Sequence, residues 1–498
     1  MTTTVSGSYP AVNSDSDATI NGLTVGKGGG SVANSTVVGN GALASNSTGN
    51  YNSAFGQYAL NANTSDGNNA FGWYSQNATT SGTYNVSFGT SSMFTNTTGS
   101  YNVALGGQAL RNNTTASNNT AVGYQAGYSN TTGAYNVFLG RQAGYGNTSA
   151  QENTGVGNTA LYSTTTGSQL SAFGSSTLYS NTTGANNTAL GNYALFSNTT
   201  PSGNTAVGYQ AATANTTGDA ITAVGYRALY TNTTGTNCTA VGYSALLLQT
   251  TAVNNVAVGD FALRANTTGS SNSAVGTDAL RANTTGGENT AVGHLAGTAI
   301  TTGSDNIMLG KSAGASVTTG NYNIAIGVTA AGTLATGTFG IYIGANARPS
   351  STSVSYETVI AADNTAIVGK GSSTTYFYGQ NGCYQGNNSS SWSTTSDQRL
   401  KKNIVSNNTG LDVINAIQVR NFEYRLPEEI TEVSQNQAIQ KSGVQLGVIA
   451  QELQAVLPEC VRQESTGVLR VDTDNLTWYL INAVKELKAE IDQLKGAK

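Results

Sequence analysis

The chain has 498 residues, of which only 9% are charged, while glycine reaches 61 and proline only 5. A disordered chain would be more charged and less apolar than this one, which is 38% apolar, and a collagen would need far more proline. The formal net charge of −4 provides no basic surface for nucleic acid and no polybasic patch for a membrane, so we expect neither as a partner.

Histidine and cysteine usage limits the chemistry further. His294 is the single histidine, which excludes histidine triads and histidine metal clusters within one chain. Cys238, Cys383 and Cys460 lie far apart, against a disulfide framework or a zinc site. The sequence has no apolar run of about 18 residues, and its first residues lack the features of a secretory signal. We therefore expect no metal, no cofactor and no membrane span.

A motif of the form Asn-Thr-Ala-Val-Gly recurs from Gly39 to Gly344. Seventeen of the eighteen intervals between its glycines are 17 residues long, and one is 16. A unit of this length is too short to bury its own apolar face, so successive units must stack as a solenoid. The sequence therefore predicts a mostly β fold, a parallel β-roll or solenoid of about nineteen coils. With strands about 4.8 Å apart, the rod would be on the order of 90 Å long.

The apolar residues of each coil suggest how the rod associates. One large apolar residue precedes each motif glycine, as at Phe55, Leu105, Val207 and Ile326, and an alanine usually precedes it. We expect the large residues to form a thin core and the alanines to allow close approach of backbones, inside the coil or against another chain. Such a lean rod gains stability by association, and we expect a homotrimer.

The repeat resembles the head region of trimeric bacterial adhesins, a left-handed parallel β-roll with an Asn-Ser-Val-Ala-Ile-Gly-like strand, and similar stretches occur in phage tail fibres. The resemblance covers residues 20–344 and begins with the segment 20–26, Ile-Asn-Gly-Leu-Thr-Val-Gly. A bacterial surface adhesin is therefore an alternative function. The missing secretory signal and the missing alternating strands of a membrane barrel disfavour it.

Two features of the repeat have both a structural and a functional interpretation. Triplets such as Asn130-Thr131-Thr132 match the glycosylation signal, but asparagine and glycine are also typical turn residues, and we favour the turn. Recurrent aromatic residues, such as Tyr101 before the strand and Tyr124 after it, could stack on sugar rings of a receptor. We favour packing along the rod.

Composition changes sharply towards the C-terminus. Residues 39–344 contain 13 charged side chains among 306 positions, whereas residues 396–498 contain 26 among 103. The second value is typical of a globular domain. We predict four parts: an attachment or capping segment at 1–38, a repeat shaft at 39–344, a β-rich connector at 345–395 and a C-terminal domain at 396–498.

Within the C-terminal domain, hydrophobic periodicity predicts helices at 411–417 and 447–457, the second ended by Pro458, and strands at 419–424 and 468–471. The last segment is a helix whose apolar residues repeat at spacings of four and three. This seam fits either a lone helix packed on its own domain or, as we favour on a fibrous chain, a short trimeric coiled coil. Its residues are Leu480, Val484, Leu487, Ile491 and Leu494.

The charged domain opens with Ser-Asp-Gln-Arg-Leu-Lys-Lys-Asn-Ile at 396–404. A serine and a neutral lysine can form a catalytic dyad in which the lysine accepts the serine proton. On one helix, however, Ser396 and Lys401 would lie about 140° apart, and on one strand they would face opposite sides. Spacing alone therefore favours a capping serine and solvated lysines.

This segment, with Gly447-Val448-Ile449-Ala450-Gln451-Glu452 and the terminal helix, resembles the endosialidase-type intramolecular chaperone. That family is a self-cleaving serine–lysine peptidase domain at the C-terminus of phage tail fibres and spikes, and the resemblance spans 396–498. It implies that the domain trimerises, guides folding of the preceding fibre, and then cuts the chain before the motif serine. By position, Ser396 would be the nucleophile, Lys401 the general base and Thr395–Ser396 the cut bond.

These resemblances together predict a structural, host-contacting phage tail fibre, located in the virion tail after assembly in the host cytoplasm. Its expected partners are two further copies of the chain, virion tail components at the N-terminus, and a host surface glycan or protein. An alternative is a tailspike that depolymerises polysaccharide with paired carboxylates. The acidic residues of 39–344 are widely dispersed, so we expect no catalysis beyond one self-cleavage event.

Overall fold

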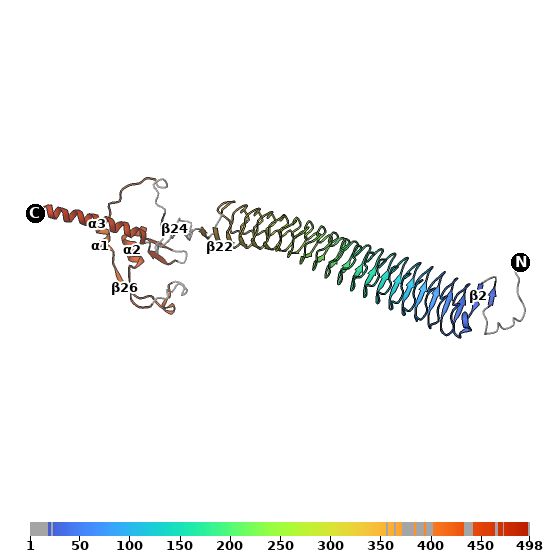
Figure 1. The fold of residues 1–498 in the computed structure, drawn as a ribbon. Coiled ribbons are helices and arrows are strands. Elements are labelled where there is room, and N and C mark those ends of the chain that lie inside the picture. The colour runs from blue at the N-terminus through green and yellow to red at the C-terminus, as the bar shows by residue number, and fades with distance from the viewer. Residues whose placement is uncertain are drawn as a thin grey trace, which may run out of the picture. The chain divides into compact units, whose positions relative to one another are not determined.

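The computed structural model describes residues 18–20, 23–354, 357–362, 365–370, 383–384, 393–394, 402–432, 442–463, 467–471 and 473–496. The chain divides into two compact units, Met1–Thr395 and Ser396–Lys498. In Figure 1 the first unit runs from blue to yellow-brown, and the second is orange to red.

The first unit is built around a parallel β-solenoid of nineteen coils, each with one three-residue strand (Figure 1). Its strands run from β3 (Thr36–Val38) to β21 (Ile341–Ile343) and pair in parallel, each residue beside its counterpart in the next coil. The predicted mostly β fold and parallel stacking are therefore confirmed. The intervening strands are β4 (Ser53–Phe55), β5 (Asn69–Phe71), β6 (Val86–Phe88), β7 (Val103–Leu105), β8 (Thr120–Val122), β9 (Val137–Leu139), β10 (Thr154–Val156), β11 (Ser171–Phe173), β12 (Thr188–Leu190), β13 (Thr205–Val207), β14 (Thr222–Val224), β15 (Thr239–Val241), β16 (Val256–Val258), β17 (Ser273–Val275), β18 (Thr290–Val292), β19 (Ile307–Leu309) and β20 (Ile324–Ile326).

Antiparallel strands cover both ends of this parallel stack. At the N-terminal end, β1 (Ala18–Ile20) and β2 (Leu23–Gly26) form a hairpin, and β2 pairs antiparallel with β3. At the other end, β22 (Glu357–Ala362) pairs parallel with β21 and antiparallel with β23 (Thr365–Lys370). An uncovered strand edge is a template for aggregation, so these strands protect the ends of the solenoid. The short elements η1 (Gly29–Ser31), β24 (Cys383–Tyr384) and β25 (Ser393–Thr394) complete the unit.

The interior of the coils differs from the expected thin core of large apolar residues. Ala104 and Ala325, at the centre of their strands, are fully buried, whereas Leu105 and Ile326 beside them are 38% and 36% exposed. The expectation about which residues are buried was wrong. Side chains alternate along a strand, and the residue before the strand, such as Asn102, is already buried. The central alanine therefore faces inward, and the residue before the motif glycine faces outward.

Two ladders of buried asparagines run through the interior. In one ladder, the Asn119 side chain donates to Gly133 O at 2.9 Å, and its backbone amide donates to Asn102 Oδ1 at 3.0 Å. In the other, Asn130 Nδ2 donates to Asn113 Oδ1 at 2.8 Å and to Gly133 O at 3.0 Å. Buried amides must find hydrogen-bond partners, and these find them in the neighbouring coil and in their own turn. Because Asn130 is fully buried, the turn interpretation of its triplet holds.

The motif glycine has a steric cause. Gly123 has a φ of 133°, and a Cβ atom on it would lie 2.5 Å from the carbonyl oxygen of Gly140 in the next coil. Both the backbone conformation and the close approach exclude a side chain at this position. Successive coils can therefore stack only if each supplies a glycine here, which explains why the glycine returns at every turn of the solenoid.

Aromatic side chains form columns along the coils. Tyr128, Tyr145, Tyr162, Tyr179 and Phe196 stack in succession, with ring centroids 5.0 to 5.1 Å apart and planes within 11° of each other. Offset-stacked rings stabilise one another, and each ring inside the column has both faces covered by its neighbours. These rings therefore pack along the rod. Tyr101 also stacks on the ring of Tyr84, but Tyr101 and Tyr124 are 57% and 51% exposed, so the two interpretations given above for such residues both stay open.

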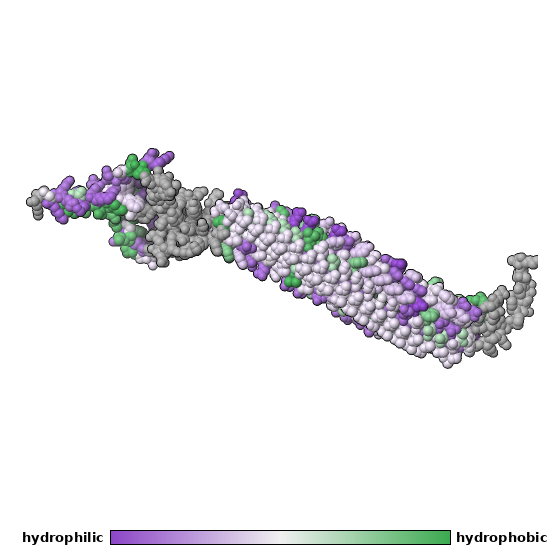
Figure 2. All heavy atoms as spheres, turned by 45° about the horizontal axis from the view of Figure 1, so that its top comes forward, coloured by the Kyte–Doolittle hydropathy of each residue, from purple (hydrophilic) through white to green (hydrophobic). Residues whose placement is uncertain are grey.

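The surface of the first unit carries few charges. Figure 2 shows that most of the drawn face of the solenoid is of intermediate hydropathy, with scattered hydrophilic and hydrophobic residues. This pattern agrees with the 13 charged side chains among residues 39–344.

The second unit is a small α+β arrangement. Helices and strands lie near all four predicted segments, although the strand β27 (Gln445–Gly447) includes the first residue of the second predicted helix. Leu453, Leu457, Cys460 and Val461 form its buried core. No helix within the described ranges is long and apolar enough to cross a membrane. Its elements are α1 (Leu411–Ala416), β26 (Arg420–Phe422), η3 (Pro427–Glu429), β27 (Gln445–Gly447), α2 (Ala450–Val456), η5 (Pro458–Cys460), β28 (Val461–Gln463), β29 (Leu469–Val471) and α3 (Thr473–Gly496), with β26–β27 and β28–β29 each pairing antiparallel.

Candidate functional site in the C-terminal unit

The residues predicted to act chemically open the second unit. Thr395, Ser396 and Lys401 lie outside the described residues, so the dyad and the cut bond remain predictions. Lys402 follows directly and is exposed, and the chain continues as an open loop to Gly410. Val405 in this loop is 85% exposed. The described part of the motif therefore lies at the surface of the unit.

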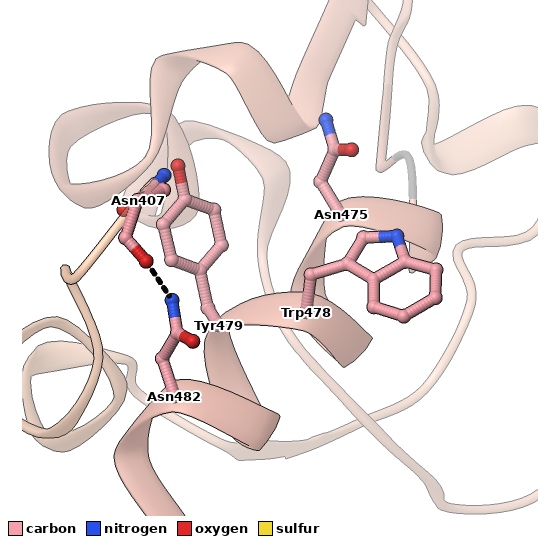
Figure 3. A pocket seen from close by; sticks show the side chains of 5 residues that line it. All are labelled: Asn407, Asn475, Trp478, Tyr479 and Asn482. Carbon is pink, nitrogen blue, oxygen red and sulfur yellow. Dashed lines mark hydrogen bonds between the residues drawn. The ribbon is translucent and has the colours of Figure 1, made fainter. Parts of the chain in front are cut away.

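The end of this loop is fixed to α3. The Asn482 side chain on α3 donates to the carbonyl oxygen of Asn407 at 2.7 Å (Figure 3) and to that of Thr409 at 3.3 Å. A Cβ atom on the buried Gly410 would lie 2.5 Å from the backbone nitrogen of Ala483 on α3, so a side chain there would force the loop away from the helix. These contacts join residues that are more than 70 positions apart in the chain.

Helix α1 begins where this loop ends and is also held by α3. The backbone amide of Leu411 donates to Glu486 Oε2 at 2.5 Å, and the Ile414 amide donates to Gly410 O at 3.0 Å. The first amides of a helix have no partner within the helix, and a carboxylate stabilises them through charge and hydrogen bonding. The position of α1 therefore depends on a carboxylate from the terminal helix.

A pocket of about 230 Å³ lies between the loop and α3, lined by Asn407, Asn475, Trp478, Tyr479 and Asn482 (Figure 3). The described residues that line it carry carboxamides and aromatic rings, and none of these five has an ionised side chain. Asn482 is engaged with the backbone of Asn407. Among the described residues, the pocket offers hydrogen bonds and packing surface, and the Asn482 contact holds the loop against α3.

Two further polar contacts tie the elements together. The Tyr479 hydroxyl donates to the Glu459 carboxylate, which joins α3 to η5. This hydrogen bond lowers the pKa of Glu459 and raises the pKa of Tyr479. Arg420 on β26 donates from Nε and from Nη2 to the two carboxylate oxygens of Glu452 on α2, both at 3.1 Å. A paired arginine fork of this kind fixes orientation as well as attracting charge.

Helix α3 has a second apolar face that its own domain leaves uncovered. Leu476, Tyr479 and Ala483 face the core and α1, whereas the seam predicted from the heptad spacing is exposed. In the part of the chain that the structure describes, the packing of the seam on its own domain, which the sequence left as an alternative, is therefore not seen. The exposed fractions are 53% for Leu480, 59% for Val484, 45% for Leu487, 38% for Ile491 and 71% for Leu494.

Among the described residues, no group of three or more histidine, cysteine, aspartate or glutamate side chains could hold a metal ion. Sequence reasoning also missed Asn407, Gly410 and Asn482, which hold the loop. The run Asn-Asn-Thr-Gly at 407–410 signals a turn before α1, but no local pattern pairs it with α3.

Comparison with known families places the second unit. The family model described as chaperone of endosialidase matches residues 396–462, from the motif serine to β28. No curated protein matches the chain. The C-terminal unit thus carries a chaperone-of-endosialidase domain. A domain of this kind that follows a nineteen-coil β-solenoid in the sequence fits a structural protein of the tail-fibre or tailspike type.

Proposed function

We propose that the protein is a homotrimeric, host-contacting fibre of the phage tail, whose C-terminal unit aligns three chains and then cuts itself off at Thr395–Ser396. The observation that carries this proposal is the family match, which begins at Ser396, the residue at which the second compact unit begins. Residues 1–38 would join the fibre to the tail, and the shaft would meet a glycan or protein of the host surface.

The exposed seam of α3 supports association of the C-terminal units. Full burial of one Leu, Val or Ile side chain is worth about 1.5–3 kcal/mol, and five such residues lie along the seam, each at least 38% exposed. Their spacings of four and three residues match the seam of a coiled coil. Three copies of α3 packed along this seam would cover it.

The repeat supplies the reason for a chaperone. Every coil presents nearly the same surface, so chains aligned one coil out of register would bury almost as much as correctly aligned chains. A globular trimer at one end fixes the alignment and raises the local concentration of the chains. Removing it afterwards makes the assembled state kinetically stable, since the device that started assembly is gone.

The proposed chemistry uses two side chains. Ser396 Oγ attacks the carbonyl carbon of Thr395 while neutral Lys401 accepts the hydroxyl proton. The peptide C–N bond breaks, the Ser396 nitrogen takes a proton to become an amine, and Thr395 is left as an ester on Ser396 Oγ. Water hydrolyses the ester, giving a Thr395 carboxylate and a free N-terminal serine. Lys401 must have a lowered pKa, which burial or nearby positive groups such as Arg399 can provide.

One mass-spectrometry experiment tests both parts of the proposal. Under denaturing conditions wild type should give fragments of 395 and 103 residues, whereas Ser396→Ala and Lys401→Ala should give one uncut chain. Under native conditions all three should be trimers. Lys402→Ala and Ser406→Ala are matched controls at exposed positions of the same loop, and both should be cut as wild type.

Cutting in Ser396→Ala, or a new N-terminus at another residue, would overturn the dyad. A native wild-type monomer would overturn the trimer.

A further inference from the structure

One face of the solenoid carries no charge and has an apolar residue in every coil. In each strand from β3 to β21 the first and third residues face outward, and the third is apolar in every coil. We call the two outward residues of these nineteen strands the strand row. The exposed fraction reaches 62% at Phe88, 48% at Leu190 and 45% at Leu309. The third residues are Val38, Phe55, Phe71, Phe88, Leu105, Val122, Leu139, Val156, Phe173, Leu190, Val207, Val224, Val241, Val258, Val275, Val292, Leu309, Ile326 and Ile343.

Charged residues are excluded from this face. None of the 38 outward positions of the strand row is Asp, Glu, Lys or Arg, although 13 charged residues occur between Gly39 and Gly344. All 13 lie outside the strands. A solvent-facing strand normally carries charged or polar residues that keep the surface soluble and prevent unwanted pairing. Charge is absent over nineteen consecutive strands, although Thr, Ser or Asn stands at the first outward position in twelve of them. An uncharged face with an apolar residue at every level is the kind of surface that an assembled protein covers.

We propose that the strand row is the surface along which copies of this chain meet in the assembled shaft. This inference rests on the proposed homotrimer and identifies which of its faces lies inside. Strands at about 4.8 Å spacing repeat over a length on the order of 90 Å, and a second copy has the same spacing and the same length. Two copies in register can therefore contact each other at every coil.

The size of the face fits a stable interface. Two outward residues on one strand make a face about 10 Å wide. Covering this face along the whole rod therefore removes on the order of 900 Å² of surface per chain from contact with water. Stable protein interfaces bury about 800 Å² per partner. Many residues of the strand row are β-branched, such as Thr222 and Val224, and lose little rotamer freedom on contact. The face is therefore preorganised for packing against a flat partner.

A sugar ligand fits this face less well. Glycans are recognised through hydrogen bonds and open aromatic faces, whereas the third position of the strand row offers mainly aliphatic side chains. Charged and aromatic side chains such as Arg111, Tyr145 and Tyr226 lie on other parts of the coil. If the strand row packs inward, these side chains are left for contact with solvent and the host.

A fluorescent probe on each face tests the inference in the full-length chain. Pyrene would be attached to Val224→Cys in the strand row or, as a matched control, to Thr234→Cys in an exposed turn of the same coil, both in a Cys383→Ser background. Pyrene groups from different copies give excimer emission only when they touch. We expect excimer emission from Val224→Cys and none from Thr234→Cys, in samples whose native mass is that of a trimer.

Lysine substitutions give a second test with the same readout, a probe at Val258→Cys. Val207→Lys, Val224→Lys and Val241→Lys together place charge in three adjacent coils of the strand row and should abolish the excimer. The matched triple Thr217→Lys, Thr234→Lys and Thr251→Lys places the same charge in exposed turns and should preserve it. Both sets project outward from a single solenoid, so neither should unfold the shaft of one chain.

The outcomes separate this inference from the function on which it rests. A trimer whose excimer comes from Thr234→Cys and not from Val224→Cys overturns the inference and leaves the homotrimer standing. A Val224 probe that responds only to added glycan or lipid vesicles also overturns it, because the face then has another occupant. A monomeric wild-type chain overturns the homotrimer and this inference together.

Discussion

The solenoid and the C-terminal unit bury their chains in different ways. Each coil of the solenoid buries the same kinds of residue, an inward alanine such as Ala121 and a side-chain amide such as that of Asn119. The C-terminal unit has a core of four well-buried residues and relies on single contacts such as Asn482 to Asn407. Charged residues make up 13 of 306 positions in the first region and 26 of 103 in the second.

The two regions differ in what their contacts can determine: repeated contacts stabilise the shaft, whereas unique contacts can fix a position along the chain. In a solenoid each coil contacts only its neighbours, so stability accumulates coil by coil, but no coil marks its own place along the chain. The C-terminal unit has contacts that occur once, such as Leu411 with Glu486, and an apolar helix face that one chain leaves open. Under the proposed function, the region with the smaller core is the one that would align the chains.

We expect the largest effect on assembly from removing the C-terminal unit. A chain synthesised only to Thr395 keeps all the coils but has nothing to align them between copies. We expect insoluble or misregistered shafts, measured as loss of soluble protein and of a protease-resistant core. The full-length Ser396→Ala chain is the control and should give soluble trimers. Soluble, protease-resistant trimers from the shortened chain would contradict the chaperone role.

Phe138 offers the next largest effect, because it is a non-repeating residue inside the repeat. It occupies a position held by alanine in most coils, and Gly144 in the same coil makes room: a Cβ there would lie 2.4 Å from the Phe138 ring. Phe138→Ala should cost about 3–5 kcal/mol in free energy of unfolding, from the cavity it leaves. Denaturant unfolding of the shaft measures the loss.

The double variant Phe138→Ala with Gly144→Leu should recover much of this stability, since leucine occupies the equivalent position at Leu161 with a similar φ of 56°. Gly144→Leu alone should destabilise the shaft by collision with the ring. If the two substitutions are additive, Phe138 and Gly144 do not form the proposed size-matched pair.

Such exceptions show which features the sequence could reveal. The recurrence of the motif glycine predicted parallel stacking, because a fixed period and a glycine at each turn leave few other folds. The choice of buried residue was not predicted. Leu105 was expected inside because of its size, but side chains alternate from the buried Asn102 onwards, so Ala104 faces inward instead. Helices of the second unit were predictable from local periodicity. Contacts such as Asn407 with Asn482 were not, since no local pattern pairs residues 75 positions apart.

A smaller, stabilising effect should come from repairing an asparagine ladder. At Thr164 the ladder is interrupted, and both Thr164 Oγ1 and Asn147 Oδ1 are buried without a hydrogen-bond partner. Thr164→Asn would supply a carboxamide that donates to Asn147 and should stabilise the shaft by about 1 kcal/mol. Thr166→Asn, at an exposed position of the same turn, is the matched control and should change stability little. Equal unfolding midpoints for Thr164→Asn and wild type would contradict this account of the ladder.

The smallest effect concerns pH and is confined to the C-terminal unit. The Tyr479 hydroxyl donates to Glu459, so the carboxyl pKa is lowered below its ordinary value of about 4.3. This contribution to stability is fully present above that value and is lost as pH falls through the lowered pKa. The raised pKa of Tyr479 has the opposite consequence, a contribution present below about pH 10 and lost as pH rises through the raised value.

Tyr479→Phe should remove both dependences while keeping the ring that packs on the core. The expected loss at neutral pH is under about 1 kcal/mol, because the pair lies near the surface. Unfolding of the C-terminal unit would be followed by circular dichroism from pH 3 to 7 in wild type, Tyr479→Phe and Tyr424→Phe. The last variant removes a hydroxyl elsewhere and should keep the wild-type slope. If Tyr479→Phe also keeps it, other carboxylates govern the acid limb, and α3 is held to the unit by its apolar contacts and the Asn482 and Glu486 hydrogen bonds.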